Sequence, residues 1–537
     1  MTKVDTLIIG TGVAGTAIAY KILDKHPKAS ILMLEAGPKV KMKDFALFQD
    51  YVITGNLPYS NSMDEPYPDR DTDTPGENSL DANVNLQLRG SRLMIYGGST
   101  VHWGGWSFRL KPEDFKLKTY TGKGIDWPID YDDLEPYYCE SEHFIGVSGD
   151  SNNKYVQRSQ PYPYDPFPYT LEDGEVIKAL TKKNIDYNHM PIARHGITDS
   201  ESVHAPCQTT GTCKYCPFGA RFVAGNYLDD IIAYGDHPNL KVQYDAVVDT
   251  ITMTSSNEAR GVRYYDKNTK VWVEVEAKRV IIAAGSIESA KLLLRSKSVG
   301  HDNGIGNNHD LVGRNLITHP YFIYQANIPS NPERLQPEMN FPTLVSRYYD
   351  SPEEQKDGKF IIVSSPSSPL VNLGKGMTQG KTRKEMDAIT TGKVGVQLHG
   401  IIEVFSEFDN RITPLDQISH LGMQETKVTF TKSDSFDKRM KYVEERLAEI
   451  FEEMNATDVK NIMISWRADH AACLTRMADS PEEGVVDKNL KVFGVDNLYV
   501  CSNASFSSLG AVNPTLTLGA LSLRLGDYLV KDIENNN

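Results

Sequence analysis

Residues 4–23 of the chain read VDTLIIGTGVAGTAIAYKIL, and this stretch decides the fold of the N-terminal part. The apolar run Thr6–Ile9 predicts a buried β-strand, and the last residues of the stretch predict an amphipathic helix. Between the two lie Gly10, Gly12 and Gly15, with the G-x-G-x-x-G spacing of dinucleotide-binding turns. Strand, glycine turn and helix in this order predict the first unit of a Rossmann-like α/β sheet.

The next apolar segment, SILMLEAG at residues 30–37, predicts the neighbouring strand and carries Glu35 near its end. In such folds the first glycine permits the tight turn, the second lets a pyrophosphate approach the backbone, and the third lets helix and strand pack closely. The helix N-terminus then faces the anion. Glu35 can accept hydrogen bonds from a ribose, which favours FAD or NAD over NADP. The strand, the helix and the acid together disfavour the alternative of a glycine-rich turn without a ligand.

A second unit of the same kind lies far along the chain. VVDTITM at residues 247–253 and GVRYY at residues 261–265 predict paired strands. KRVIIAAGSIESAKLLLRS at residues 278–296 then predicts a strand, a small-residue turn at Gly285 and a helix. A binding domain assembled from distant segments is more typical of flavoproteins than of nicotinamide dehydrogenases.

Length and charge limit the classes of protein that the chain can belong to. With 537 residues it is too long for one hydrophobic core, so two domains, or one domain with a large insertion, are expected. Its 40% hydrophobic and 24% charged residues describe a globular protein, and its net charge of −14 argues against a nucleic-acid partner.

The sequence carries no transmembrane run, since no apolar stretch reaches roughly 18 residues. Because the N-terminus is better explained as a strand entering a glycine turn, we expect no export signal on this chain. The expected location is the cytoplasm, or the periplasm if a signal-bearing partner carries the chain across the membrane.

Several longer motifs together resemble one enzyme family. They are YGGSTVHW (96–103), DWPIDYDDLEPYY (126–138), LVGRNLITHP (311–320), VVDKNLKVFGVDNLYV (485–500) and AVNPTLT (511–517). With these motifs the chain resembles the glucose-methanol-choline (GMC) family of FAD oxidoreductases, and most closely its bacterial sugar dehydrogenase branch. That branch holds FAD-dependent glucose, fructose, gluconate and glucoside dehydrogenases, and pyranose 2-oxidase is a relative. The resemblance runs from residue 5 to about residue 530.

The resemblance implies two domains. Residues 1–320 would form a Rossmann-like FAD-binding domain, with a surface loop at about 60–80 and a proline-rich connector at about 158–170. Residues 321–461 would form an α+β substrate domain whose antiparallel sheet covers the flavin, and residues 462–537 would return to the FAD-binding domain. Within the substrate domain, the helical spacing of five apolar residues predicts a core-facing helix: Met440, Val443, Leu447, Ile450 and Met454.

The resemblance also implies the catalytic pair. DHAACLTRM places His470 where the family has its catalytic histidine, and AVNPTLT places Asn513 where the partner residue falls. His470 would take the hydroxyl proton and Asn513 would orient the substrate oxygen; the alternative is a histidine that fills a gap in the core. Asn513 and Pro514 also fit the N-cap and first position of a helix that continues through Thr515.

Further residues are implied to contact the flavin. GGSTVHWGG would run along the ring, through Gly97, Gly98, His102 and Trp103, and the family likeness adds Val248 and Gly285 to the cofactor contacts. His102 falls where pyranose 2-oxidase carries the histidine bonded to its flavin. The sequence therefore leaves two roles open for His102, a covalent bond to FAD or simple packing beside the ring.

Three of the six cysteines lie close together in CQTTGTCKYCP, residues 207–217. Relatives that pass electrons to a cytochrome hold an iron–sulfur cluster in Cys-x5-Cys-x3-Cys-Pro, whereas Cys207, Cys213 and Cys216 have one residue fewer in the second gap. Zinc with His204 as fourth ligand, a Cys213–Cys216 disulfide and unligated thiols are the alternatives. Cys139, Cys473 and Cys501 stand alone.

These observations predict FAD-dependent oxidation of a sugar or glycoside hydroxyl to a keto sugar or lactone. A dehydrogenase with a non-oxygen acceptor is favoured over a pyranose-oxidase-like enzyme that makes H2O2, and the expected partners are a small subunit and an electron-acceptor protein. From another class, the chain could be an inactive flavin-binding subunit of an electron-transfer complex. A nicotinamide-dependent dehydrogenase is the third alternative.

Overall fold

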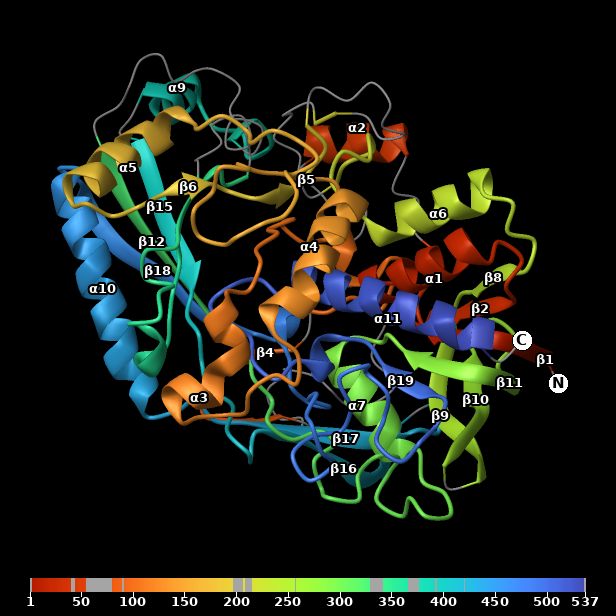
Figure 1. Cartoon of the computed structure of the whole chain (residues 1–537). Helices are drawn as coiled ribbons and strands as arrows, with labels where there is room; N and C mark the ends of the chain where they lie inside the picture. The colour runs from red at the N-terminus through yellow and green to blue at the C-terminus, as the bar shows by residue number, and fades with distance from the viewer. Residues whose placement is uncertain are drawn as a thin grey trace.

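The computed structural model describes residues 2–39, 44–54, 80–88, 91–196, 206–207, 215–255, 257–328, 341–365, 376–391, 394–419 and 421–535. Two large sheets organise the chain, with helices on their outer sides (Figure 1). The two chain ends lie near each other beside the first sheet.

The first sheet is built from segments far apart in the sequence. Its order is β8 (Leu240–Gln243), β2 (Ile31–Leu34), β1 (Thr2–Ile9), β11 (Val271–Ile282), β10 (Glu258–Asp266) and β9 (Ala246–Ser255), and β19 (Leu498–Val500) also pairs with β11. Strands β8, β2, β1, β11 and β19 run parallel to one another. Strand β10 pairs antiparallel with both β11 and β9. This arrangement confirms the predicted Rossmann-like unit made of distant segments.

Helices cover this sheet and bury its apolar strands. They are α1 (Val13–Lys25), α4 (Tyr131–Ile145), α6 (Ala224–Tyr234), α7 (Ser286–Arg295) and α11 (Thr515–Asn535). Helix α11 packs closely on α1, since a Cβ at Gly526 would lie 2.5 Å from the Cβ of Lys21. The strand residues Leu7, Ile8 and Ile281 are fully buried.

The second sheet is almost wholly antiparallel. Its order is β4 (Leu86–Gln87), β18 (Thr457–Arg467), β12 (Pro320–Ile328), β15 (Val394–Ile401), β14 (Ile362–Ser365), β13 (Leu344–Ser346) and β6 (Asn188–His189). Burial alternates along β12, with even-numbered residues buried and odd-numbered residues partly exposed, as expected for a strand between two different environments. Strand β18 runs across the predicted boundary at residue 461, and β4 and β6 join this sheet from earlier in the chain.

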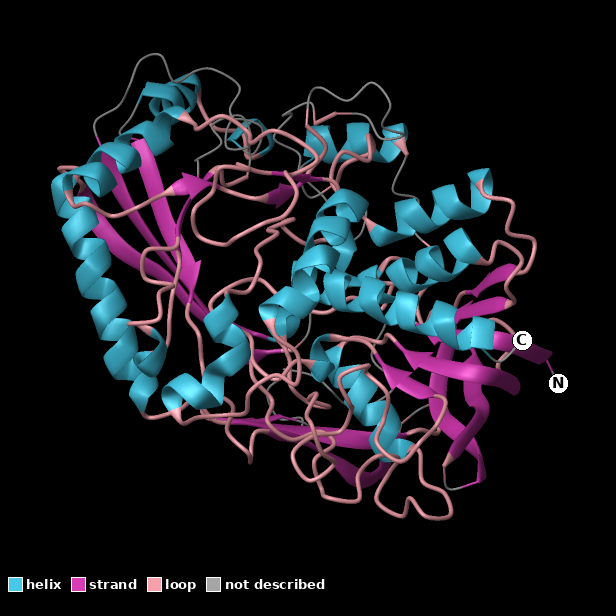
Figure 2. Ribbon diagram, in the orientation of Figure 1, coloured by secondary structure: helices cyan, strands magenta, loops and turns pink. Residues whose placement is uncertain are grey.

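Helix α10 (Ser435–Glu453) packs on the outer face of the second sheet, beside α5 (Leu171–Lys182) (Figures 1 and 2). The five apolar residues predicted at helical spacing are all buried. The ring of Phe436 contacts Trp466 on β18, with ring centroids 4.9 Å apart. The apolar residues at helical spacing therefore form the buried side of a helix that packs on the sheet, and they are not part of a functional site.

Smaller elements complete the fold. The remaining strands are β3 (Leu80–Ala82), β5 (Val147–Ser148), β7 (Ile192–Ala193), β16 (Arg411–Ile418) and β17 (Gln424–Phe430), and the remaining helices include α2 (Phe45–Thr54), α3 (Leu117–Thr121) and α9 (Arg383–Thr391). Residues 158–170 form neither helix nor strand, and most of the predicted loop at 60–80 lies outside the described residues. Among the described helices, no segment is both long and apolar enough to cross a bilayer.

Candidate functional site

A cavity of about 690 Å³ lies between the two sheets. Its floor comes from the first sheet, at the carboxyl ends of β1, β2, β11 and β19, and its roof comes from β12, β15 and β18. Ligands of open α/β sheets bind outside the carboxyl ends of the strands, and a volume of this order suits a small molecule or cofactor.

The glycine turn forms one wall of the cavity. Gly10 has φ +104°, a conformation that disfavours any residue with a Cβ. A Cβ at Gly15 would lie 2.2 Å from the Gly10 carbonyl oxygen, so only glycine allows α1 to pack this close to β1. Gly12 lines the cavity, and a Cβ there would meet no atom within 4 Å. Gly10 and Gly15 therefore have the geometry of a tight turn and of close helix–strand packing, and the space around Gly12 leaves room for the predicted pyrophosphate.

The segment that carries Gly97 and Gly98 lies directly over this turn. The Gly97 amide donates a hydrogen bond to Oγ1 of Thr11 over 3.1 Å, and a Cβ at Gly98 would lie 3.2 Å from the Cα of Gly12. Gly98, His102 and neighbouring residues line the cavity. Two stretches that are far apart in sequence thus form one continuous glycine-rich surface.

Glu35 follows β2 and is buried at the edge of the cavity. Its carboxylate accepts hydrogen bonds from the Thr11 amide (3.2 Å), the Thr11 hydroxyl (2.5 Å) and the Gly37 amide (3.0 Å). Burial raises the pKa of Glu35 to about 6, although these hydrogen bonds oppose the rise. Since a carboxylate has about four acceptor positions, one remains for a ligand hydroxyl.

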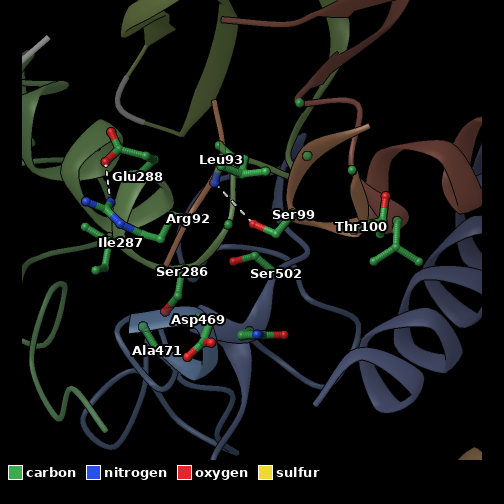
Figure 3. Close-up of a pocket in the computed structure, with 18 of the residues that line it drawn as sticks. Arg92, Leu93, Ser99, Thr100, Ser286, Ile287, Glu288, Asp469, Ala471 and Ser502 are labelled. Atoms are coloured by element: carbon green, nitrogen blue, oxygen red, sulfur yellow. Dashed lines mark hydrogen bonds and ion pairs between the residues drawn. The ribbon is translucent and has the colours of Figure 1, made fainter. Parts of the chain in front are cut away.

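Three helices point their N-terminal ends at the same cavity: α1 through Val13 and Ala14, α7 through Ser286 and Ile287, and α11 through Thr515 and Leu518. The first turns of these helices hold no acidic residue except Glu288 of α7, and this carboxylate is paired with Arg92 over 3.0 Å (Figure 3). Helix N-termini carry partial positive charge and favour anionic groups. Gly285 begins α7 with φ +75°.

Helix α11 begins one residue later than the sequence predicted. Its first helical residue is Thr515, and the Pro514 carbonyl accepts the first helical hydrogen bond, from the Leu518 amide at 2.9 Å. Pro514 therefore holds the N-cap position that was predicted for Asn513. Asn513 precedes the helix, which leaves its side chain free to point into the cavity.

His470 and Asn513 meet at the cavity, as the family likeness predicted. Nε2 of His470 lies 3.2 Å from Nδ2 of Asn513, and both residues line the cavity. His470 ends a short 3-10 helix, Ala468–His470, directly after β18. Loss of hydration lowers the pKa of His470. The negative charge of Asp469 opposes this decrease, whereas the positive charge of Arg467 adds to it. The histidine is thus neutral at neutral pH and can act as a base.

A third residue, His319, completes this group and is absent from the sequence-based set. Its Nδ1 lies 3.0 Å from Nδ1 of His470, and its Nε2 lies 2.8 Å from the Gly510 carbonyl oxygen. Burial lowers the pKa of His319 to about 3. The residue is the last but one of the motif LVGRNLITHP, but a contact across 151 positions leaves no local signal in the sequence.

The roof of the cavity is mostly apolar. Ile401 and Met463 line it from β15 and β18, and Trp106 lines it from the segment after the glycines. Tyr321 supplies the polar group: its hydroxyl is hydrogen-bonded to Nδ1 of His399, and Nε2 of His399 lies 2.5 Å from Oγ of Ser365. These roof residues belong to a region where the sequence offered no motif.

Two further predicted residues also line the cavity. Val248 reaches it from β9, and Trp103 reaches it while its indole nitrogen donates to the Phe222 carbonyl over 2.8 Å. His102 ends the 3-10 helix Gly98–Val101. The cavity lining includes the predicted cofactor residues with three exceptions: Gly15, which packs against Gly10, Gly97, which precedes Gly98, and Pro514, which caps α11.

The cysteine stretch is only partly described. Cys207 and Cys216 belong to the described residues, whereas Cys213 and His204 lie outside them, so the iron–sulfur, zinc and disulfide hypotheses all remain predictions. Within the described part of the chain, no group of three metal-binding side chains is present. Cys139, Cys473 and Cys501 are buried, as expected for packing residues.

Two family models, both described as GMC oxidoreductase, match the chain. The N-terminal model matches residues 187–321 and the C-terminal model matches residues 409–522, which include the His470 and Asn513 segments. The chain belongs to the GMC oxidoreductases. It is therefore an oxidoreductase that acts on CH–OH groups.

Named GMC relatives match over most of their length. The fructose dehydrogenase large subunit of Gluconobacter japonicus is 28% identical, with 99% of this chain and 98% of the relative covered. The 2-methyl-1,2-propanediol dehydrogenase of Mycolicibacterium austroafricanum is 26% identical, with 98% and 95% covered. The 6'''-hydroxyparomomycin C oxidase of Streptomyces lividus is 26% identical, with 80% and 77% covered. Dehydrogenases and oxidases thus both appear among the relatives.

Solved structures agree with the fold. Pyridoxine 4-oxidase from Mesorbium loti superposes with a TM-score of 0.61 at 15% identity, covering 98% of this chain and 99% of that one. The R554A variant of Aspergillus oryzae RIB40 formate oxidase, studied for FAD modification, superposes with a TM-score of 0.61 at 14% identity, covering 100% and 99%. At these identities the likeness shows the fold, and it confirms the predicted α/β architecture.

The GMC fold implies FAD, and the residues of the cavity fit that cofactor. The glycines leave a cradle for a pyrophosphate, three helix N-termini face it, and Glu35 keeps one acceptor position for a ribose. Among the described residues, Oγ of Ser286 and Oδ1 of Asn503 are buried in the cavity wall without a hydrogen-bond partner. Both are therefore available to polar atoms of a bound cofactor.

Proposed function

We propose that this chain is an FAD-dependent dehydrogenase that oxidises a hydroxyl of a sugar or glycoside to a keto sugar or lactone. The observation that carries the proposal is the pair formed by His470 and Asn513, which projects into the same cavity as the glycine turn. The named relatives support the substrate class, because fructose dehydrogenase, gluconate 2-dehydrogenase and paromamine 6'-oxidase carry carbohydrate substrates in their names.

The residues of the chain have distinct tasks in this reaction. Nε2 of His470 accepts the proton of the substrate hydroxyl, and loss of hydration keeps this imidazole neutral beforehand. The Asn513 side chain orients the substrate oxygen so that the carbon bearing it faces the cofactor. FAD held by the glycine turn and Glu35 would supply the hydride acceptor for that carbon. Oxidation of the alcohol to a carbonyl removes one proton, which His470 takes, and one hydride, for which the cofactor would be the acceptor.

The roof of the cavity fits a sugar ring. Trp106, Ile401 and Met463 provide apolar surface for the C–H faces of a ring, while Tyr321 provides a hydroxyl. Aromatic and apolar residues with a few placed polar groups are typical of small-ligand pockets. On this proposal Tyr321 contacts a substrate hydroxyl other than the one that is oxidised.

A non-oxygen electron acceptor is the favoured end point. One relative matched over nearly its whole length is named a fructose dehydrogenase large subunit, which supports a small partner subunit and an electron-acceptor protein for this chain as well. An iron–sulfur cluster at Cys207, Cys213 and Cys216 would extend such a relay. Iron and zinc measured on the purified protein test this part of the proposal.

A second candidate is an oxidase that passes the electrons to O2. Relatives named 6'''-hydroxyparomomycin C oxidase and C-glycoside 3-oxidase support it. His102 lines the cavity, in the segment predicted to run along the flavin ring. We therefore also propose a covalent bond between His102 and FAD. Acid precipitation decides the bond: colour that stays with the protein supports it, and colour in the supernatant contradicts it.

The test of the proposed function is an anaerobic panel of sugars and glycosides scored by bleaching of the flavin band. Bleaching by at least one sugar supports the enzyme, and no bleaching by any sugar supports the inactive flavin-binding subunit instead. Turnover with a dye or quinone in air, compared with H2O2 formation, then separates the two electron acceptors. A purified protein without a flavin spectrum would support the nicotinamide alternative.

A further inference from the structure

We propose that His319 is the positioning residue that holds the proton of His470 on Nδ1, so that Nε2 faces the cavity as a lone pair. This inference rests on the proposed function, because it explains how the proposed base acquires its reactive form. It concerns three groups in a row: the Gly510 carbonyl, His319 and His470.

The first step fixes the proton on His319. The Gly510 carbonyl oxygen can only accept a hydrogen bond, and it lies 2.8 Å from Nε2 of His319. Nε2 therefore carries the proton. His319 is 3% exposed, and burial, with the neighbouring His470, lowers its pKa to about 3. A neutral imidazole with its proton on Nε2 has a lone pair on Nδ1.

The second step fixes the proton on His470. The two Nδ1 atoms are 3.0 Å apart, and the rings are nearly perpendicular, with an interplanar angle of 89°. If neither nitrogen carried a proton, two lone pairs would face each other at this distance. Since Nδ1 of His319 is the acceptor, Nδ1 of His470 is the donor. The lone pair of neutral His470 is then on Nε2.

The third step orients Asn513. A lone pair on Nε2 of His470 requires a donor, so the amide of Asn513 presents its Nδ2 over 3.2 Å. Among the described residues, Oδ1 of Asn513 then has no hydrogen-bond partner and is buried. A substrate hydroxyl that donates to Nε2 replaces this amide contact, and a second contact to Asn513 orients its oxygen. His319 thus donates to the Gly510 carbonyl, His470 donates to His319, and Nε2 of His470 is left to accept from the substrate hydroxyl.

Both ends of this row are firmly held. Oγ of Ser508 accepts from the Trp127 indole over 2.7 Å and donates to the Asp114 carbonyl over 3.0 Å, which holds the segment before Gly510. The His319 segment is tied to the His470 loop, because the Ala472 amide donates to the Ile317 carbonyl over 2.9 Å. Fixed partners are what allow one histidine to select the tautomer of another.

The test compares His319→Leu with His319→Asn in the flavin-loaded full-length protein. An asparagine oxygen lies near the position of Nδ1 and can accept from His470, whereas leucine cannot. We expect the rate of flavin reduction by sugar to fall by about 10²–10⁴ in H319L, the contribution typical of a positioned base. H319N should reduce flavin about 2- to 10-fold faster than H319L, because it restores one hydrogen bond to His470. His237→Asn, a histidine outside the cavity lining, is the control.

A second readout does not depend on turnover. In protein labelled with ¹⁵N-histidine, the imidazole signals assigned by comparison with His470→Asn report which nitrogen of His470 carries the proton. A proton on Nδ1 supports the proposal, and a proton on Nε2 overturns it. Equal losses in H319L and H319N, with normal flavin content and melting temperature, also overturn it, because they indicate a purely structural role.

The two proposals fail separately. If no sugar bleaches the flavin of the wild-type protein, the proposed function fails, while the nitrogen signals still decide the tautomer. If H319L does not fold, the wild-type signals decide. If sugars bleach the flavin but His470 carries its proton on Nε2, the function stands and the role of His319 is wrong.

Discussion

Nε2 of His470 lies 3.2 Å from Nδ2 of Asn513, although the two residues are 43 positions apart. His470 follows β18 of the second sheet, and Asn513 precedes helix α11, which covers the first sheet. The pair therefore joins the two halves of the molecule at the cavity. Its chemistry depends on the charge state of the histidine, which makes pH the most direct probe.

The rate of flavin reduction by the wild-type protein should fall only at acidic pH. Loss of hydration lowers the pKa of His470 from its ordinary value of 6.5, and the neutral form is the base. The rate is therefore full above the folded pKa and falls as pH drops through it, with a midpoint below 6.5. Stopped-flow measurement of flavin reduction against pH checks this. A midpoint above 6.5 would contradict the assignment of His470 as the base.

Replacing Asn513 with aspartate should move this midpoint upward. A carboxylate about 3.2 Å from Nε2 stabilises the protonated imidazole, and an opposite charge at this range typically moves a midpoint to a pH about 1–3 higher. Asn513→Ala is the matched control, since it removes the amide without adding charge. The expected result is a slower enzyme in both variants, with the acid limb displaced only in N513D.

The Gly15→Ala variant should lose cofactor. The added Cβ would lie 2.2 Å from the Gly10 carbonyl oxygen, which forces the turn away from the position that accepts a pyrophosphate. Overpacking costs about 1–3 kcal/mol, and a penalty of that size weakens binding about 5- to 150-fold. The ratio of flavin to protein absorbance after dialysis measures the loss.

Gly174→Ala in α5 is the control for this prediction. A Cβ at Gly174 would meet no atom within 4 Å, so the substitution adds no clash. Alanine in place of glycine stabilises a helix by about 0.5–1 kcal/mol. G174A should keep its flavin and gain slightly in melting temperature, and equal flavin loss in both variants would argue against a specific role for Gly15.

Local patterns predicted much of the fold. The strand before Gly10, the helix after it and the buried face of α10 follow from apolar spacing, which depends only on neighbouring residues. The start of α11 was predicted one residue too early, because Asn513 and Pro514 match the residue types preferred at the N-cap and at the first helical position, whereas the helix begins after Pro514. Two-residue strands such as β4 and β6 leave no pattern at all.

The candidate site was predictable only where a motif reached it. The resemblance pointed to His470 and Asn513, and the glycine turn predicted the contacts for the cofactor. His319 and Tyr321 flank Pro320 in the sequence. Their hydrogen-bond partners, His470 and His399, come from other parts of the chain. Such pairings depend on the register of the second sheet, which no local spacing encodes.

Tyr321 gives the sharpest test of substrate recognition. Tyr321 lines the cavity from β12, and its hydroxyl is hydrogen-bonded to His399, whose other ring nitrogen lies 2.5 Å from Oγ of Ser365. Burial lowers the pKa of His399 to about 3, so this histidine is neutral. If Ser365 donates to Nε2, His399 donates to the Tyr321 oxygen, and the Tyr321 proton is then available to a substrate hydroxyl.

Removing that hydroxyl should weaken sugar binding more than catalysis. A neutral hydrogen bond contributes about 0.5–1.5 kcal/mol, so Tyr321→Phe should raise KM for the best sugar about 2- to 10-fold. For a cyclic alcohol with a single hydroxyl, such as cyclohexanol, KM should change little, because it has no second hydroxyl to lose a partner. Steady-state kinetics with a dye acceptor measures both.

Tyr324→Phe supplies the matched control on the same strand. The Tyr324 hydroxyl contacts Glu444 of α10, on the opposite face of the sheet from the cavity. Y324F should therefore lower the melting temperature without changing the ratio of the two KM values. If Y321F raised KM equally for the sugar and for cyclohexanol, the hydroxyl would serve only to hold His399 in place. A rise confined to the sugar would instead identify Tyr321 as the residue that distinguishes a polyol from a simple alcohol.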